Sequence, residues 1–199
     1  MFVERVNDYT DERFEKDVLN QHGAFLIHGR PYSVKIVSLH TAVITGEDKN
    51  LFETVIETFR YYAEHITIFI DDRSNIVKKY PDVKLFRVNL YDIQPSQLFV
   101  NENKLEAVST FVNTSEDVVI PLMENKGELI SLDGHTRMKA AELKGIETVY
   151  GLRSHDEDYG VDFSRIAKRR NITSIKDVKV LNDKDYDRAW IQFCENIHE

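Results

Sequence analysis

The chain has 199 residues, of which 42% are hydrophobic, 11% aromatic and 30% charged. This composition excludes a disordered chain, and the length suits one substantial domain or one domain with a large accessory layer. The net charge of -8 is the wrong sign for a protein that coats nucleic-acid phosphates, which argues against nucleic acid as a partner.

Targeting signals and the number of cysteines limit where in the cell the protein is expected to act. No apolar run approaches the about 20 residues that a membrane-spanning helix needs, so we expect no membrane segment. The first residues lack the basic-then-apolar order of a secretory signal, and we expect a cytoplasmic protein. Cys194, the single cysteine, cannot form an internal disulfide and is expected to be a core thiol.

The first 84 residues alternate strand and helix patterns. Residues 24–44 read as strand, turn and strand, with the turn at His28–Pro31. A helix is predicted from Glu47 to near His65, because apolar residues recur there at steps of three and four. The apolar strand Ile66–Ile70 then ends in the polar cluster Asp71–Asn75. We expect residues 1–84 to form an α/β extension packed on the rest of the chain.

The middle of the chain, residues 85–152, carries sharper local signals. Strand Phe86–Leu90 leads through a turn at Ile93–Ser96 to a helix that Asn101 caps. Strands over 118–123 and 129–132 are joined by Asn125-Lys126-Gly127, which is typical of a tight hairpin. A helix over 138–144 ends at Gly145, and strand 148–152 follows.

Residues 153–199 are predicted to form a C-terminal helical segment, with helices at about 161–170 and 183–197. In the last helix Tyr186, Trp190, Phe193 and Ile197 form a stripe. Core packing is favoured for this stripe over a platform for a nucleobase. The predicted fold class is therefore α/β or α+β, with one core between the two flanking segments.

The most informative stretch is Leu132-Asp133-Gly134-His135-Thr136-Arg137, which joins a predicted strand to a predicted helix. The first amides of a helix lack internal partners and favour an anion, so this turn is a candidate phosphate site. Gly134 allows close approach, while His135, Thr136 and Arg137 add an imidazole, a hydroxyl and a guanidinium. The alternative is that Asp133 only caps the helix and the other side chains are solvated.

Several short motifs in one order give this region a resemblance to a known superfamily. The segment from 85 to 152 resembles the ParB/sulfiredoxin-like superfamily, whose members include sulfiredoxins, ParB partition proteins with a ParB-like nuclease domain, and ATP- or ADP-dependent free-serine kinases. The resemblance implies that the strand-to-helix turn holds nucleotide phosphates. The motifs that carry it are Val88-Asn89-Leu90, Asp92–Leu98, Asn101–Leu105, Ile120-Pro121-Leu122 and Leu132–Arg137.

Comparison within the superfamily separates its activities. A sulfiredoxin has a nucleophilic cysteine in this turn, where His135 stands here. ParB proteins carry a second arginine where this chain has Thr136, and they add a helix-turn-helix reader that is not evident after Leu152. Residues 91–152 hold 5 Lys and Arg against 10 Asp and Glu, which also argues against DNA binding.

The free-serine kinases are the closest match, because Asp133, Gly134, His135 and Arg137 reproduce their Asp-Gly-His-x-Arg turn. The resemblance implies a nucleotide or phosphorylated small molecule as ligand, ATP or ADP with Mg²⁺ as cofactors, and phosphoryl transfer to a small hydroxyl substrate such as serine. The catalytic candidates are then Asp133, His135 and Glu102. The ligand-binding candidates are Pro95, Ser96, Gln97, Gly134, His135, Thr136 and Arg137.

One departure from the kinase pattern matters, since Gln97 stands where those kinases place a catalytic Glu. An amide cannot accept a proton, so Glu102 is the candidate replacement, although an acid in the first turn of a helix also has a structural explanation.

Three other classes stay open: a partition-type nucleic-acid regulator, a non-catalytic protein-interaction module, and a metal-dependent enzyme in which Asp71 and Asp72 meet His135. The sequence carries no signal for an oligomeric state.

Overall fold

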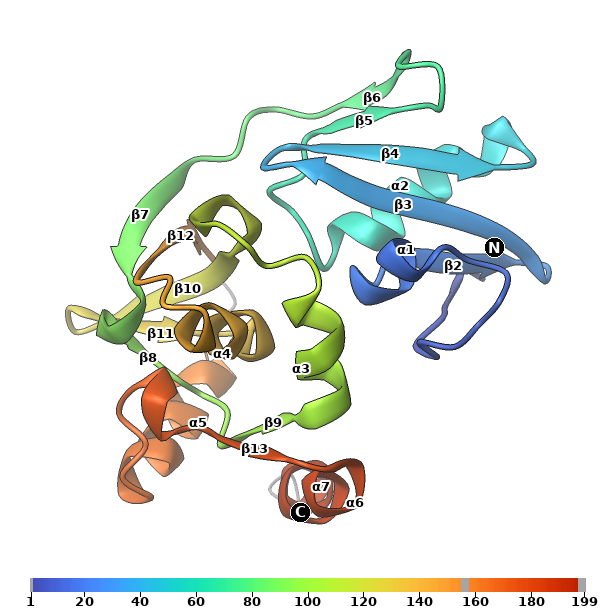
Figure 1. Ribbon diagram of the computed structural model, residues 1–199. Helices are drawn as coiled ribbons and strands as arrows, with labels where there is room; N and C mark the ends of the chain where they lie inside the picture. The colour runs from blue at the N-terminus through green and yellow to red at the C-terminus, as the bar shows by residue number, and fades with distance from the viewer. Residues whose placement is uncertain (1, 155–157, 197–199) are drawn as a thin grey trace. The chain divides into compact units, whose positions relative to one another are not determined.

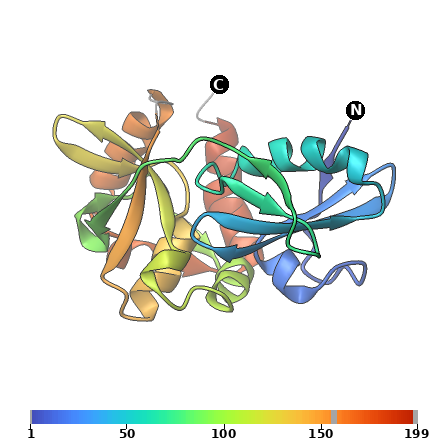
Figure 2. The ribbon, with the colours of Figure 1, turned by 90° about the horizontal axis from the view of Figure 1, so that it is seen from above.

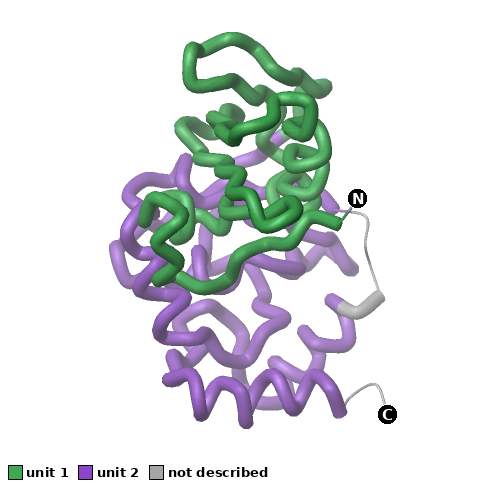
Figure 3. Tube along the Cα trace, turned by 90° about the vertical axis from the view of Figure 1, so that its right-hand side faces the viewer, with its two compact units in different colours: residues 1–84 green, residues 85–199 purple. Residues whose placement is uncertain are grey.

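The protein is an α+β protein with mixed sheets, as the sequence predicts. The computed structural model describes residues 2–154 and 158–196. The chain divides into two compact units, residues 1–84 and residues 85–199, which Figure 3 distinguishes by colour. No helix within the described ranges is long and apolar enough to cross a membrane.

The first unit is built on a six-stranded sheet in the order β1-β2-β3-β4-β5-β6. Only β4 and β5 pair in parallel, and the other neighbours are antiparallel. Helix α2 lies along one face of this sheet (Figure 2). The elements are β1 (Glu4–Arg5), α1 (Lys16–Asn20), β2 (Ala24–Ile27), β3 (Arg30–Ser38), β4 (Thr41–Gly46), α2 (Phe52–Arg60), β5 (Ile68–Ile70) and β6 (Ile76–Lys79).

The core of the first unit follows the predicted helix pattern. The buried face of α2 consists of Phe52, Val55, Ile56 and Phe59, which pack against sheet residues such as Phe69. The helix is shorter than predicted, because it ends at Arg60 rather than near His65. Tyr62, predicted on the apolar face, is 49% exposed because it lies beyond the helix end. Strand β6 directly follows the Asp71–Asn75 turn and had no signal in the sequence strong enough to predict it.

The second unit contains a five-stranded mixed sheet in the order β7-β12-β10-β11-β8 and a separate two-stranded sheet of β13 and β9. Figure 1 shows its helices with their labels. The elements are β7 (Leu85–Asn89), β8 (Ile93–Gln94), β9 (Phe99–Asn101), α3 (Glu102–Ser109), β10 (Val119–Asn125), β11 (Glu128–Ser131), α4 (His135–Leu143), β12 (Thr148–Arg153), α5 (Asp158–Arg169), β13 (Lys179–Leu181), α6 (Asp183–Tyr186) and α7 (Gln192–Asn196).

The local signals in this unit are confirmed. Asn101 caps α3 by accepting a hydrogen bond from the Lys104 amide at 3.0 Å. Lys126 and Gly127 have φ of 52° and 82°, the left-handed pair that a two-residue hairpin turn requires. Gly145 has φ of 71° just after α4, as expected at a helix C-terminus. The first turn fixes the register of β10 on β11, and Gly145 marks the end of α4. The strand-to-helix turn lies between β11 and α4.

The C-terminal segment is more broken than predicted. A five-residue π-helical stretch, Asp187–Ile191, separates α6 from α7. Tyr186 is buried, and Trp190 and Phe193 pack against the main core of the unit, which confirms the packing predicted for this stripe. The fourth member, Ile197, lies outside the described residues. Cys194 is only half-buried, and burial together with the neighbouring Glu195 raises the pKa of its thiol.

Candidate functional site

The predicted phosphate turn lies between β11 and α4. Strand β11 ends at Ser131, Gly134 takes φ of 82° at the position that begins the helix, and α4 starts at His135. A side chain at Gly134 would be strained by this φ, and its Cβ would approach the Cδ1 atom of Ile120 to 2.8 Å. The positive φ therefore favours glycine here, and a larger residue would also require the end of the Ile120 side chain to shift.

The start of α4 leaves its first amides without acceptors. The Met138 amide makes the first helical bond, to the Gly134 carbonyl at 2.9 Å, and no described residue accepts from the amides of residues 134–137. The Asp133 carboxylate does not cap them, because Gly134 is the capping residue and no side chain bonds to the helix start. The alternative in which Asp133 caps the helix is therefore wrong, and the amides have no acceptor among the described residues, which favours an anion at this end of the helix.

Arg137 folds back over this turn. Its Nη1 atom donates to the Val119 carbonyl at 3.1 Å, and a Cβ placed on Gly134 would lie 3.9 Å from both Nε and Nη2 of the guanidinium. One of the five guanidinium N–H groups is thus used to hold the side chain in position. Asp133 is exposed, and Thr136 is half-buried. The turn therefore presents a positive edge beside one free carboxylate.

His135 has a different role from the predicted one. Its imidazole is buried, and its Nε2 atom accepts from the amides of Ser96 at 3.1 Å and of Gln97 at 3.2 Å. Desolvation by burial lowers the pKa of His135 to about 4, although the charge of Asp133 acts in the other direction. The ring is therefore neutral at pH 7 with the proton on Nδ1, and Nε2 is not free to donate to a ligand.

These two bonds bring the second predicted segment to the first. Residues Pro95, Ser96 and Gln97 form the link between β8 and β9, and His135 holds the amides of that link beside the start of α4. The Ser96 hydroxyl adds a bond of 2.6 Å to the Ser131 carbonyl at the end of β11. The structure thus joins residues 96 and 97 to His135 at the start of α4.

The remaining candidates lie differently. Glu102 is exposed in the first turn of α3, and no hydrogen bond or ion pair joins it to the turn within the described part of the chain. Gln97 donates from Nε2 to the Phe99 carbonyl at 2.5 Å and to the Tyr186 hydroxyl at 3.1 Å. Sequence reasoning placed Tyr186 in the core stripe and missed this bond. The only signal was a tyrosine, rather than phenylalanine, on an apolar stripe.

Of the two aspartates proposed for a metal in the first unit, Asp71 is occupied by protein groups, whereas Asp72 is exposed. Asp71 is buried and accepts from the Lys49 ammonium at 2.9 Å and from the amides of Arg73 and Asn75. The bond from Lys49, with those of Asn75 and Arg73, lowers the pKa of Asp71 far below its usual value. Among the described residues no three His, Cys, Asp or Glu side chains gather as metal ligands. Asp71 therefore stabilises the turn that follows β5.

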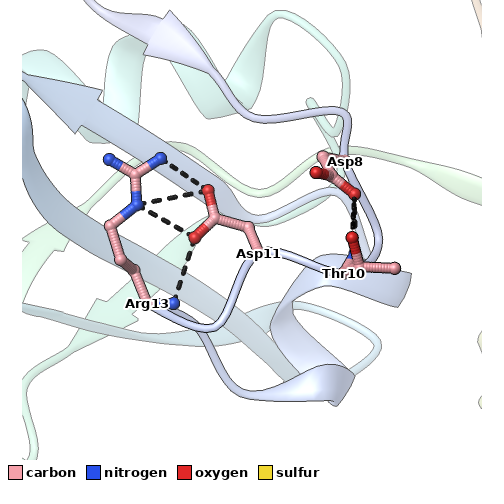
Figure 4. Close-up of polar contacts among 4 residues, drawn as sticks. All are labelled: Asp8, Thr10, Asp11 and Arg13. Atoms are coloured by element: carbon pink, nitrogen blue, oxygen red, sulfur yellow. Dashed lines mark hydrogen bonds and ion pairs between the residues drawn. The ribbon is translucent and has the colours of Figure 1, made fainter.

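The acidic segment near the N-terminus is also self-contained. The Asp11 carboxylate accepts two bonds from Arg13 Nε and one from Arg13 Nη2 at 2.6 Å, and Asp8 accepts from Thr10 (Figure 4). The hydrogen bonds from Arg13 lower the pKa of Asp11 to about 2. Each acid is thus held by a residue two positions away, and these acids fix the local loop rather than a ligand site.

Comparison with known proteins gives little beyond this. No family model matches the chain, and no curated protein matches it. The chain is similar to the solved structure of protein Atu1540 from Agrobacterium tumefaciens, with 17% sequence identity and a TM-score of 0.36. The match covers 49% of this chain and 62% of that one, so the chain spans less than two thirds of that protein.

Proposed function

We propose that the second unit binds the phosphate group of a nucleotide or related phosphorylated molecule at residues 133–137, and that the associated reaction is phosphoryl transfer to a small hydroxyl substrate. The single observation that carries the proposal is the start of α4, where four amides without acceptors lie beside the Arg137 guanidinium. The resemblance of residues 85–152 to the ParB/sulfiredoxin-like superfamily supports the same assignment.

The proposed role of each site residue follows from its contacts. Gly134 permits close approach, and the amides of 134–137 and the guanidinium of Arg137 neutralise phosphate oxygens. His135 acts as a positioning residue, since its Nε2 atom is already used to hold Ser96 and Gln97. Thr136 supplies a hydroxyl at the same turn. Pro95, Ser96 and Gln97 then form the opposite side of the site.

Phosphoryl transfer would need a proton acceptor and a metal. Asp133 is the free carboxylate of the turn, and it would share Mg²⁺ with the phosphate oxygens or accept the proton of the attacking hydroxyl. In that reaction an oxygen–phosphorus bond forms to the substrate hydroxyl, the bridging bond of ATP or ADP breaks, and the hydroxyl proton leaves to the carboxylate. Glu102 is the second carboxylate to test, because Gln97 cannot take a proton.

Binding is tested by calorimetry and thermal shift with ATP, ADP, CTP and inorganic phosphate, with and without Mg²⁺. A ligand at about 100 times its dissociation constant adds about 2.7 kcal/mol of stability. We expect Arg137→Ala to weaken binding by roughly 1.5 to 3 kcal/mol, the usual range for a hydrogen bond to a charged group. The matched control is Arg165→Ala, because Arg165 is exposed on α5 and pairs with Asp162 on the same helix. Equal affinities in both variants would contradict the site.

Catalysis is tested separately with Asp133→Asn, ATP or ADP, and serine. We expect turnover to be lost while nucleotide affinity stays within a few-fold, because the variant keeps the amides and Arg137. Glu102→Gln is the companion variant, and loss of turnover there instead would move the proton acceptor to α3. A tight, strongly salt-dependent gel shift with DNA would favour the partition-type alternative.

A further inference from the structure

The Tyr186 hydroxyl is bonded to Gln97, one of the residues proposed to form the phosphate site, although Tyr186 comes from the far end of the chain. Its side chain is 8% exposed, and its oxygen accepts a hydrogen bond of 3.1 Å from Nε2 of Gln97. The same nitrogen donates to the Phe99 carbonyl, which fixes the orientation of the amide. Gln97 is in turn bound through its own amide to His135. Tyr186 is thus two hydrogen bonds away from the first residue of α4.

The fold holds Tyr186 there by pairing two short strands. Strand β13 pairs in parallel with β9, with Lys179 opposite Phe99 and Leu181 opposite Asn101. The Asn101 side chain then donates to Asp183, the first residue of α6, at 2.6 Å. These contacts begin α6 beside the start of α3. The position of Tyr186 is therefore set by backbone pairing rather than by the side chain alone.

The hydroxyl hydrogen of Tyr186 is not used in any hydrogen bond among the described residues. The oxygen accepts from Gln97, and no described residue accepts a hydrogen bond from the phenol. Burial raises the pKa of Tyr186 to about 12, and the charges of Cys194 and Asp133 act in the same direction. The phenol is therefore protonated at pH 7, and its hydrogen has no acceptor among the described residues; an unpaired donor on a residue that is 8% exposed is costly unless a ligand supplies an acceptor.

We infer that the Tyr186 hydroxyl donates a hydrogen bond to the phosphate group bound at residues 134–137, which makes the C-terminal segment a part of the binding site. This inference rests on the proposed function, because it needs an anion at the turn. The inference also gives Gln97 a role that a glutamate could not fill. The Gln97 amide donates to the Tyr186 oxygen and so leaves the phenol hydrogen for an acceptor on the ligand. A glutamate at this position would instead accept that hydrogen.

The first test compares Tyr186→Phe with Tyr150→Phe, a matched loss of one hydroxyl from a half-buried tyrosine of the same unit. Inorganic phosphate and ATP are titrated into the full-length chain by calorimetry, and each variant is also unfolded in urea. We expect Tyr186→Phe to weaken binding about tenfold, the effect of one hydrogen bond to a charged group, with no loss of stability beyond that of the control. Unchanged affinity in Tyr186→Phe would overturn the inference.

The second test gives a signal that a structural role would not produce. With 3-nitrotyrosine at position 186, the phenol ionises nearer neutral pH and its absorbance reports the ionisation. Asp133, Cys194 and Gln97 already face this group, and Lys104 lies 6.0 Å from the ring. Bound phosphate adds an anion beside the phenol, so we expect its pKa to rise on titration with phosphate, whereas 3-nitrotyrosine at position 150 stays unchanged.

The outcomes separate this inference from the proposed function. Absence of any binding by the wild-type chain overturns both. Binding by the wild type with no change in the nitrotyrosine pKa at position 186 overturns the inference alone and leaves the turn at 133–137 as the site.

Discussion

Two aspartates that follow apolar strands show how differently similar sequences can be used. Asp71 follows β5 in the first unit, and Asp133 follows β11 in the second. The Asp71 carboxylate is buried and accepts bonds from Lys49, Arg73 and Asn75, so every nearby donor is satisfied. Asp133 is exposed, and the amides that follow it have no acceptor. The first turn serves the fold, and the second leaves its polar groups for something else.

An aspartate at the end of a strand is therefore by itself a poor predictor of a ligand-binding site. Both positions looked like candidate ligand sites in the sequence, because a carboxylate at the end of a strand suits a metal or a nucleotide. What separates them is whether the surrounding donors and acceptors are paired within the protein. A buried carboxylate with a full set of partners is part of the structure, whereas amides without acceptors among the described residues, beside a guanidinium with N–H groups still unused, favour the binding of an anion.

Replacing each aspartate with alanine tests whether Asp71 stabilises the fold and Asp133 does not. We expect Asp71→Ala to cause the largest destabilisation of the variants discussed, because it leaves the Arg73 and Asn75 amides and the Lys49 ammonium without their acceptor. Asp133→Ala removes no hydrogen bond and should leave the midpoint of urea unfolding unchanged. Equal midpoints for the two variants would show that Asp71 is no more structural than Asp133.

The next largest effect is expected for His135→Ala. The amides of buried Ser96 and half-buried Gln97 lose their acceptor, and each unsatisfied group costs about 1 to 3 kcal/mol. We therefore expect a loss of about 3 kcal/mol in the free energy of unfolding, measured in urea at pH 7. His135→Gln retains an acceptor and serves as control. A loss under about 1 kcal/mol in His135→Ala would mean that the imidazole does not hold the 96–97 link.

Features of the site that depend on neighbouring residues were predictable from the sequence. Features that depend on contacts between residues far apart in the chain were not. The Asn101 cap, the Lys126-Gly127 turn and Gly145 follow from local backbone rules, and each is confirmed. The strand-to-helix turn was located for the same reason. The partners of Gln97 were not predictable, because Tyr186 is 89 residues away and reaches it through two strands of three residues each.

The role of His135 could not be read from its neighbours either. A histidine between Gly134 and Thr136 at a helix start looks like an exposed donor, and only the amides of a link 38 to 39 residues earlier make it a buried acceptor. The same non-local pairing turned Asp71 from a candidate metal ligand into a structural residue, since Lys49 lies 22 residues before it. Local patterns find turns, and tertiary contacts decide what the turns do.

The pH dependence of the free energy of unfolding tests whether the His135 imidazole is buried in its neutral form. Burial lowers the pKa of His135 from 6.5 to about 4, so below pH 6.5 the unfolded chain binds a proton that the folded chain does not. The stabilisation from the neutral ring is complete above pH 6.5 and is lost as the pH falls toward 4, by up to about 3 kcal/mol. Urea unfolding across this range, with His135→Gln as reference, measures the difference. Parallel curves would contradict a buried neutral ring.

The smallest effect is expected at the glycine of the turn, where conformation and space can be separated. Gly134 and Gly145 both have positive φ, 82° and 71°. A Cβ at Gly145 meets no atom within 4 Å, whereas one at Gly134 approaches Ile120 to 2.8 Å. We expect Gly145→Ala to cost about 1 kcal/mol for backbone strain alone, and Gly134→Ala about 2 kcal/mol because the end of the buried Ile120 side chain must also shift.

The same pair of variants distinguishes the turn as a binding site from the turn as a simple junction. Gly134→Ala displaces the amides at the start of α4, so phosphate affinity should fall together with stability, whereas Gly145→Ala lies at the other end of α4 and should change stability alone. Urea unfolding and phosphate calorimetry on both variants give the two quantities. If Gly134→Ala loses stability and keeps full affinity, the close approach that glycine permits serves the packing against Ile120 and not a ligand.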